Sequence, residues 1–209
     1  MLLNDRSIKQ YRESGHIVIE PFNEEQLNNV SYDLSLGENF AFHSGVVSFK
    51  DLKDHNESFS LEQHDISGGW EIVRVSDGII LHQGQRCLGH SREFAGGTYI
   101  ESQGFTAVTS YLQCTSTAAR LGLTACLCAG WGDVGYINRW TFEICNLSPR
   151  SLFIPVRGII AQLCFETVDV PEKIYGMHQG AYQSGNNLKE LQRKWTPTMM
   201  LPKGLKVVV

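Results

Sequence analysis

Residues Thr115–Asn146, TSTAARLGLTACLCAGWGDVGYINRWTFEICN, are the most informative part of this chain for its fold. Its last third alternates between apolar and polar residues, a pattern typical of a half-buried β-strand. We therefore expect a strand over Tyr136–Cys145 with Glu143 on its more polar face. The apolar face carries Trp140, Phe142 and Ile144. Because the neighbours of Glu143 are uncharged and Cys145 favours burial, this carboxylate is expected to have a specific role.

Outward from this stretch, short β-type segments recur between turn residues, which predicts a mainly β sandwich or barrel with a few short helices. Further strands are expected at Glu71–Val75, Gly78–His82, Arg86–Ser91, Phe105–Leu112, Thr124–Ala129, Ser151–Pro155 and Ile159–Thr167, with earlier β-type runs at residues 16–22 and Val30–Gly37. Helices are expected from Asn4 or Asp5 to Ser14 and over Leu188–Trp195. The polar segment His43–Gly69 is interpreted as a long loop.

Length and charge limit the class of protein. A chain of 209 residues is expected to form a single domain over 1–209. A formal charge of -4, from 18 basic and 22 acidic residues, argues against a nucleic-acid or membrane surface. No apolar run reaches the roughly 18 residues of a membrane span, and the first residues resemble no export signal. We therefore expect a cytoplasmic protein whose six cysteines are reduced and buried.

Three groups in the opening stretch could carry chemistry. Thr115, Ser116 and Thr117 precede Arg120, and hydroxyls at a helix start beside an arginine could hold phosphate, although a capped turn is the commoner explanation. Asp133 lies in a glycine-rich turn that could aim its carboxylate at a ligand, or simply cap the turn. A zinc centre is not expected. His55 and Glu57 match half of a zinc deaminase signature whose cysteine pair is missing, and Cys126 and Cys128 lack a second pair.

These residues together resemble the dCTP deaminase family, within the dCTP deaminase and trimeric dUTPase superfamily. The resemblance lies in Ala119–Leu123 (ARLGL), Ala129–Asp133 (AGWGD) and Phe142–Asn146 (FEICN). Supporting matches are Ser31–Gly37 (SYDLSLG), Ile80–Gly84 (ILHQG) and Ile160–Glu166 (IAQLCFE), with a looser one at the tyrosines near residues 175–183. The landmarks follow the family's order from about residue 1 to 183.

The resemblance implies a distorted β-barrel of the dUTPase-like β-clip type, assembled as a homotrimer with shared active sites. It implies a pyrimidine deoxynucleotide substrate, with Mg²⁺ bound through the substrate phosphates and no catalytic zinc. Glu143, Ser116 and Arg120 would be catalytic, with Glu143 activating the water that attacks the cytosine ring. Residues 184–209 would form a C-terminal lid or extension. Substrate would be bound by Thr115, Thr117, Asp133, Cys128, Ala129, Gln162, Tyr175, Tyr182 and Gln183.

The leading expectation from the sequence is deamination of dCTP to dUTP and ammonia. The enzyme alternative is a dUTP diphosphatase, or a bifunctional enzyme giving dUMP and diphosphate, in which Asp133 orients or activates water. Two departures from the family support a third possibility, a catalytically degenerate nucleotide-binding trimer. Thr115 and Ala181 stand where the family usually has basic residues, and each loss removes a charged contact worth about 1.5–3 kcal/mol.

Overall fold

The strand β9 (Asn138–Cys145) is the centre of the molecule, as its sequence pattern predicts. In this computed structural model, which describes residues 1–43, 70–104, 106–177, 180–183 and 185–203, every second residue of β9 is buried. Trp140, Phe142 and Ile144 lie in the main hydrophobic core with at most 3% of their surface exposed. Glu143 therefore lies on the more open face, toward the functional site described below.

The larger sheet pairs β9 with the long strand β6 (Arg86–Gly97), and Leu88 lies opposite Glu143. Its other strands follow the order β1 (Ile17–Glu20), β6, β3 (Asn39–His43) and β4 (Trp70–Arg74). All pairings within this sheet are antiparallel. The register between β6 and β9 shifts between His90 and Phe94, so β6 bends there. At this bend, Glu93 reaches the neighbouring strand β2 through Ser35.

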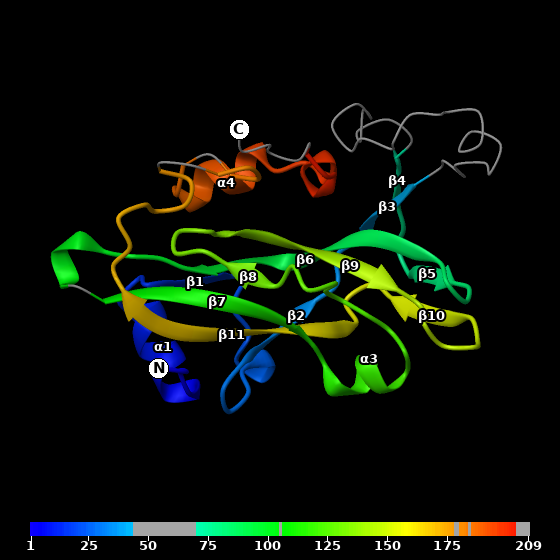
Figure 1. The fold of residues 1–209 in the computed structure, drawn as a ribbon, viewed down its shortest axis with the longest axis horizontal. Helices are drawn as coiled ribbons and strands as arrows, with labels where there is room; N and C mark the ends of the chain where they lie inside the picture. The colour runs from blue at the N-terminus through cyan, green and yellow to red at the C-terminus, as the bar shows by residue number, and fades with distance from the viewer. Residues whose placement is uncertain (44–69, 105, 178–179, 184, 204–209) are drawn as a thin grey trace, which may run out of the picture.

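A second sheet has the order β2 (Tyr32–Ser35), β11 (Ile159–Asp169), β7 (Thr106–Cys114) and β8 (Trp131–Gly132), again antiparallel. A separate pair joins β10 (Leu152–Pro155) to β5 (Gly78–Leu81). The ribbon view shows β7 and β11 along one side of the molecule and β6 and β9 along the other (Figure 1). The core fills the space between them with apolar residues from both sheets, among them Tyr32, Leu34, Phe165 and Phe142.

The expected distorted β-barrel is not closed in the part of the chain that the structure describes, where the strands form three separate sheets. A closed barrel needs a continuous hydrogen-bonded ladder around its circumference. Between β2 and β6 the backbone pairing is reduced to an isolated bridge, Leu36 with Ser91. A side chain joins the two strands instead: the carboxylate of Glu93, 1% exposed, accepts a hydrogen bond of 3.0 Å from the backbone N–H of Ser35. The mainly β class with few helices is confirmed.

Three α-helices are present among the described residues. Helix α1 (Asp5–Glu13) is capped by Asn4, whose side chain accepts a hydrogen bond from Ser7 N. Helix α3 (Ser116–Arg120) follows β7, and α4 (Leu188–Lys194) packs through Leu191 against β6 and β9. Short 3₁₀ turns lie at η1 (Glu24–Gln26), η2 (Glu101–Gln103) and η3 (Pro197–Met200). In Figure 1, α4 lies along one edge of the molecule and α3 at the opposite edge.

Two details of the strand prediction are wrong. The segment Thr124–Ala129 forms a loop, because Cys128 adopts φ 64°, a left-handed conformation that a strand cannot contain. The strands β3 and β8 were not expected, since β3 adjoins the polar run and β8 is only two residues long. The interpretation of His43–Gly69 as a loop falls almost wholly outside the described residues. Within the described residues, no helix has the length and apolar character needed to cross a membrane.

Candidate active site

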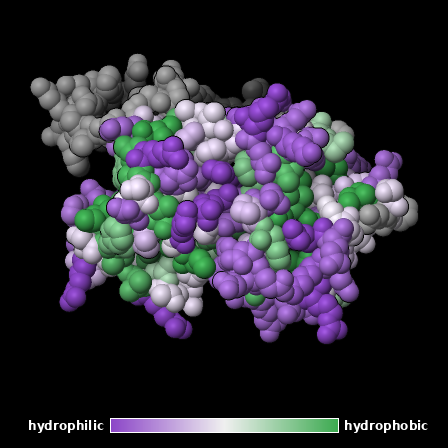
Figure 2. All heavy atoms as spheres, turned by 180° about the vertical axis from the view of Figure 1, so that it is seen from behind, coloured by the Kyte–Doolittle hydropathy of each residue, from purple (hydrophilic) through white to green (hydrophobic). Residues whose placement is uncertain are grey.

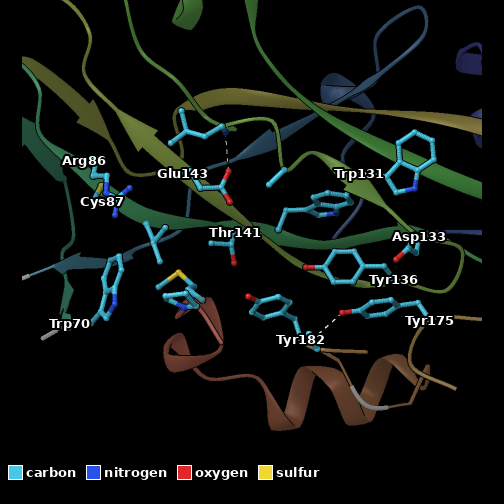
Figure 3. Close-up of a pocket in the computed structure, with 17 residues that line it drawn as sticks. Trp70, Arg86, Cys87, Trp131, Asp133, Tyr136, Thr141, Glu143, Tyr175 and Tyr182 are labelled. Atoms are coloured by element: carbon cyan, nitrogen blue, oxygen red, sulfur yellow. Dashed lines mark hydrogen bonds between the residues drawn. The ribbon is translucent and has the colours of Figure 1, made fainter. Parts of the chain in front are cut away.

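A pocket of about 490 Å³ opens between β9, the loop before β8 and the C-terminal segment (Figure 3). Five of the residues that the sequence singled out line it: Ala129, Asp133, Glu143, Tyr175 and Tyr182. The other lining residues are mostly apolar or aromatic: Trp70, Arg86, Cys87, Leu88, Leu127, Trp131, Tyr136, Trp140, Thr141, Ala181, Met200 and Pro202. An apolar hollow with a few convergent polar groups is the usual form of a small-molecule site.

Glu143 presents its carboxylate to this pocket from β9. One carboxylate oxygen, Oε2, accepts a hydrogen bond of 3.1 Å from the backbone N–H of Leu127. This bond fixes the side chain and leaves the other oxygen available to a ligand. Burial raises the pKa of Glu143 above its ordinary value, and the hydrogen bond from Leu127 only partly offsets this effect. A half-buried carboxylate with a raised pKa is suited to accept a proton and later return it.

The loop over Thr124–Ala129 is held against β9 by a threonine. The hydroxyl of Thr124 donates to the backbone carbonyl of Glu143 at 2.7 Å and accepts from the N–H of Cys145 at 2.9 Å. Farther along, Gly130 passes so close to the carbonyl of Leu112 that a Cβ there would lie 2.3 Å from that oxygen. These contacts fix the loop on both sides of Leu127, so that its N–H reaches Glu143.

Asp133 lies toward the other end of the pocket, and Tyr136 lies between it and Glu143 in Figure 3. Its side chain is exposed, and its backbone carbonyl accepts a hydrogen bond of 2.9 Å from Tyr136 N. The turn continues through Gly135, whose φ of 96° suits glycine. The backbone of Asp133 therefore takes part in a turn, and its exposed side chain lines the pocket.

Aromatic rings form one wall of the pocket. Tyr136 packs edge-on against Trp140 at 5.1 Å and against Tyr175 at 5.3 Å between ring centroids. Burial raises the pKa of the Tyr136 hydroxyl well above its ordinary range. Sequence reasoning did not select Tyr136 or Thr141, and it named Trp131 only as part of the motif Ala129–Asp133. Alternation could have found Thr141, which shares the face of Glu143, but no local pattern marks Tyr136.

The C-terminal segment forms the opposite wall. Gln183 is buried and fastens this segment by accepting from Ile137 N and donating to the carbonyl of Gly135, both at 2.8 Å. The backbone N–H of Tyr182 donates a hydrogen bond of 3.0 Å to the Tyr175 hydroxyl. Farther along the chain, Met200 is 4% exposed and lines the pocket together with Pro202. Residues well beyond the matched motifs therefore contribute to the site.

Several predicted site residues lie elsewhere in this chain. Thr115 caps helix α3, because its hydroxyl accepts a hydrogen bond from Ala118 N, a role that the sequence had given to Ser116 or Thr117. Arg120 ends the same short helix, and its side chain is exposed. The pocket lining includes none of the four predicted residues Thr115, Ser116, Thr117 and Arg120. Gln162 and Cys128 do not line it either: Gln162 accepts a hydrogen bond of 3.0 Å from Ser31, and Cys128 is exposed.

In the described ranges, no group of three or more His, Cys, Asp or Glu side chains could hold a metal ion, and His55 and Glu57 fall outside these ranges. All six cysteines are free thiols. The expectation that they are buried holds fully for Cys87 alone; Cys128 is exposed and the other four are partly so.

Known proteins of similar sequence point to one family. A family model described as dCTP deaminase-like matches residues 2–168. A protein of Nanoarchaeum equitans is 32% identical over 189 residues, covering 87% of this chain and 92% of the relative. A protein of Clostridium botulinum is 29% identical over 192 residues, covering 90% and 94%. Both relatives are named "dCTP deaminase, dUMP-forming".

A solved structure supports the fold. The 2'-deoxycytidine 5'-triphosphate deaminase from Agrobacterium tumefaciens superposes with a TM-score of 0.52 at 16% identity, covering 78% of this chain and 47% of that protein. This chain thus spans less than half of that structure. The names of the relatives correct the leading expectation, because their stated product is dUMP and not dUTP. From the family model and the full-length relatives together, it follows that this chain belongs to the dCTP deaminase-like family.

Proposed function

We propose that this protein converts dCTP to dUMP, releasing ammonia and diphosphate. The observation that carries the proposal is that two carboxylates, Glu143 and Asp133, line one pocket. Two successive hydrolyses require two water molecules, and each needs a group that accepts its proton. The dUMP-forming relatives, which match at least 87% of this chain, support the same overall reaction.

The first step is deamination, for which we assign Glu143 as base and then acid. Water attacks C4 of the cytosine ring while Glu143 takes its proton, and the same carboxyl returns a proton to the departing ammonia. The atoms balance as dCTP plus water giving dUTP plus ammonia. The raised pKa of Glu143 supports this double role, because a carboxyl that holds its proton more firmly is a better acid for the second half.

The second step is hydrolysis of the bound dUTP, for which we assign Asp133. A water attacks the α-phosphorus, the bond to the bridging oxygen breaks, and diphosphate leaves with dUMP remaining. Asp133 orients this water and accepts its proton. The two carboxylates differ in environment, since Glu143 is half-buried and Asp133 is exposed. This difference supports separate roles for the two side chains within one pocket.

We propose that the active site is completed by a neighbouring copy in a homotrimer. Ser116, Thr117 and Arg120 are exposed on α3 and do not reach the pocket of their own chain. An apolar patch supports self-association: Ile80 and Phe153 face each other across β5 and β10, and each is 60% exposed. Hydrophobic areas also interrupt the hydrophilic surface seen from behind in Figure 2.

Mixing two inactive variants tests this sharing. We expect that Glu143→Ala and Arg120→Ala, each inactive alone, regain activity when they are unfolded together and refolded. A site built from Glu143 of one copy and Arg120 of the next is intact in about a quarter of randomly mixed interfaces of a closed ring. Deamination of dCTP is the measurement. The same proteins mixed without unfolding serve as the control, and a refolded mixture that stays inactive contradicts the shared site.

The phosphates of a bound nucleoside triphosphate are negatively charged, and few positively charged side chains line the pocket. Of the described residues that line it, Arg86 alone is basic. We propose that Lys203 compensates for the absence of a basic side chain at Ala181. Its ammonium donates a hydrogen bond to the Ala181 carbonyl and lies 5.4 Å from the centre of the Tyr182 ring. Magnesium would arrive with the triphosphate, held by phosphate oxygens and not by a cluster of protein carboxylates.

Product analysis tests the proposed function. Purified protein incubated with dCTP and Mg²⁺ is expected to yield dUMP, diphosphate and ammonia in equal amounts, measured by chromatography and coupled assays. If dUTP accumulates without diphosphate, the second step is not catalysed by this protein. If nucleotide binds in calorimetry but no pyrimidine triphosphate is turned over, the protein is a degenerate binder, and Thr115→Arg becomes the variant to examine.

A further inference from the structure

A second hollow, of about 980 Å³, shares no lining residue with the active-site pocket. Its charged residues are Arg74, Arg92, Arg139, Arg157 and Glu38, and we call it the arginine hollow. The remaining lining residues are Pro21, Val75, Ser76 and Val156. Four guanidinium groups and one carboxylate give the hollow a net charge of +3, in a chain whose formal charge is -4.

These arginines come from four separate parts of the fold. Arg74 ends β4, Arg92 lies at the bend of β6, Arg139 is on β9 and Arg157 follows β10. Guanidinium groups brought together from distant positions repel one another, and this repulsion lowers stability unless an anion offsets it. In the part of the chain that the structure describes, one ion pair reaches these arginines: Arg74 to Glu38 at 3.6 Å. The other three arginines form no ion pair with a described residue, although the carboxylates of Glu38 and Glu93 act on Arg139 from a longer distance.

Arg139 packs against two aromatic rings. Its guanidinium carbon lies 4.6 Å from the centre of the Trp195 ring and 5.4 Å from that of Phe94. Its Nε is buried and has no hydrogen-bond partner among the described residues. Burial lowers the pKa of Arg139, and the nearby carboxylate of Glu38 acts in the opposite direction. The ring contacts hold the guanidinium at the hollow, where a planar, permanently charged group can receive an anion.

Arg157, which also lines the hollow, has an unusual backbone conformation. Its φ of 67° lies in the left-handed region, where glycine or asparagine is usual. A glycine is present in this turn, but it is the next residue, Gly158, and so Arg157 itself takes the left-handed conformation. The conformation is fixed by a hydrogen bond of 2.8 Å from Arg157 N to the carbonyl of Leu36. An exposed arginine is thus kept in a conformation that costs about 1 kcal/mol or more for a side-chain-bearing residue.

We propose that the arginine hollow binds a small oligophosphate anion. Guanidinium groups match phosphate oxygens in paired, fork-like hydrogen bonds, and several phosphate groups in a row could engage several arginines at once. A long nucleic-acid backbone fits less well, because the positive charge is confined to one concave place on an otherwise acidic protein. The proposal does not depend on the proposed function, since no residue of the hollow lines the active-site pocket.

Calorimetric titration with inorganic triphosphate, without Mg²⁺ and at low ionic strength, tests the proposal. We expect wild type to bind at this site, and Arg92→Gln/Arg157→Gln to bind at least about tenfold more weakly, since each lost guanidinium removes charge-assisted hydrogen bonds. Arg6→Gln is the matched control, because Arg6 is exposed on α1 and does not line the hollow. Arg120→Gln separates this site from the active site, and its binding is expected to remain.

A second measurement guards against misfolded variants. Because Trp195 stacks on Arg139, triphosphate is expected to change the tryptophan fluorescence of wild type, and Trp195→Phe should lose that change while retaining binding. A parallel titration with ATP shows whether the phosphates alone or a whole nucleotide is preferred, and stronger binding of either supports the proposal. It is overturned if wild type binds neither, if folded Arg92→Gln/Arg157→Gln binds as tightly as wild type, or if Arg120→Gln abolishes binding.

Discussion

Replacing Glu143 by alanine is expected to lower kcat for deamination of dCTP by about 10²–10⁴-fold, the usual contribution of a positioned acid–base group. KM should change far less, because the role assigned to Glu143 is in proton transfer. Ammonia release from dCTP is the measurement. Glu13→Gln, which alters an exposed glutamate at the end of α1, is the control and should keep full activity. Full activity in Glu143→Ala would falsify the assignment.

The pH profile gives an independent readout of the same side chain. Glu143 must be ionised to accept a proton from water, so deamination should fall as the pH falls through its pKa. Burial raises that pKa above the ordinary value of 4.5, and the acid limb should therefore lie at a higher pH than for an exposed glutamate. In Glu143→Gln the residual activity should lack this limb. An unchanged limb in the variant would assign it to another group.

Replacing Asp133 by asparagine is expected to stop diphosphate release from dUTP, again by about 10²–10⁴-fold. The amide keeps the size of the carboxylate and one acceptor oxygen but cannot take a proton. With dCTP as substrate, dUTP should then accumulate, because Glu143 remains in place to deaminate the base. Chromatography of dUMP, dUTP and diphosphate measures both steps in one reaction.

The matched control for this variant is Asp77→Asn, an exposed aspartate that does not line the pocket. It should release diphosphate at the wild-type rate. Two results would count against the assignment of Asp133. One is undiminished formation of dUMP by Asp133→Asn, and the other is an equal loss of ammonia release, which would make Asp133 a general binding residue.

Much of the fold could be predicted from the sequence, because local patterns determine it. The alternation of Trp140, Phe142 and Ile144 predicted β9 and placed Glu143 on its open face, since side chains of a strand alternate between two faces. Asn4 and Asp5 indicated the start of α1, because either side chain can satisfy a free backbone N–H at a helix start, and the structure shows Asn4 as the cap. Thr124–Ala129 was predicted wrongly as a strand because the left-handed conformation of Cys128 leaves no signal in a cysteine.

The site was only partly predictable. Glu143 and Asp133 were found from their motifs, and the pocket joins them. Neither motif could indicate that Met200 and Pro202 from the C-terminal segment form part of the wall, or that α3 lies away from the pocket of its own chain. These are contacts between segments distant in sequence, and no local periodicity reports them.

By itself, the sequence determined the β-rich character of this protein, its family and the two carboxylates. Hydrophobic alternation, helix caps and short motifs act over a few residues, and so they can be read along the chain. Only the tertiary structure decided that Leu127 N–H holds Glu143, that the sheets stay separate and that four arginines meet in one hollow. Each of these depends on how the strands cross and where the loops return, which long-range packing fixes.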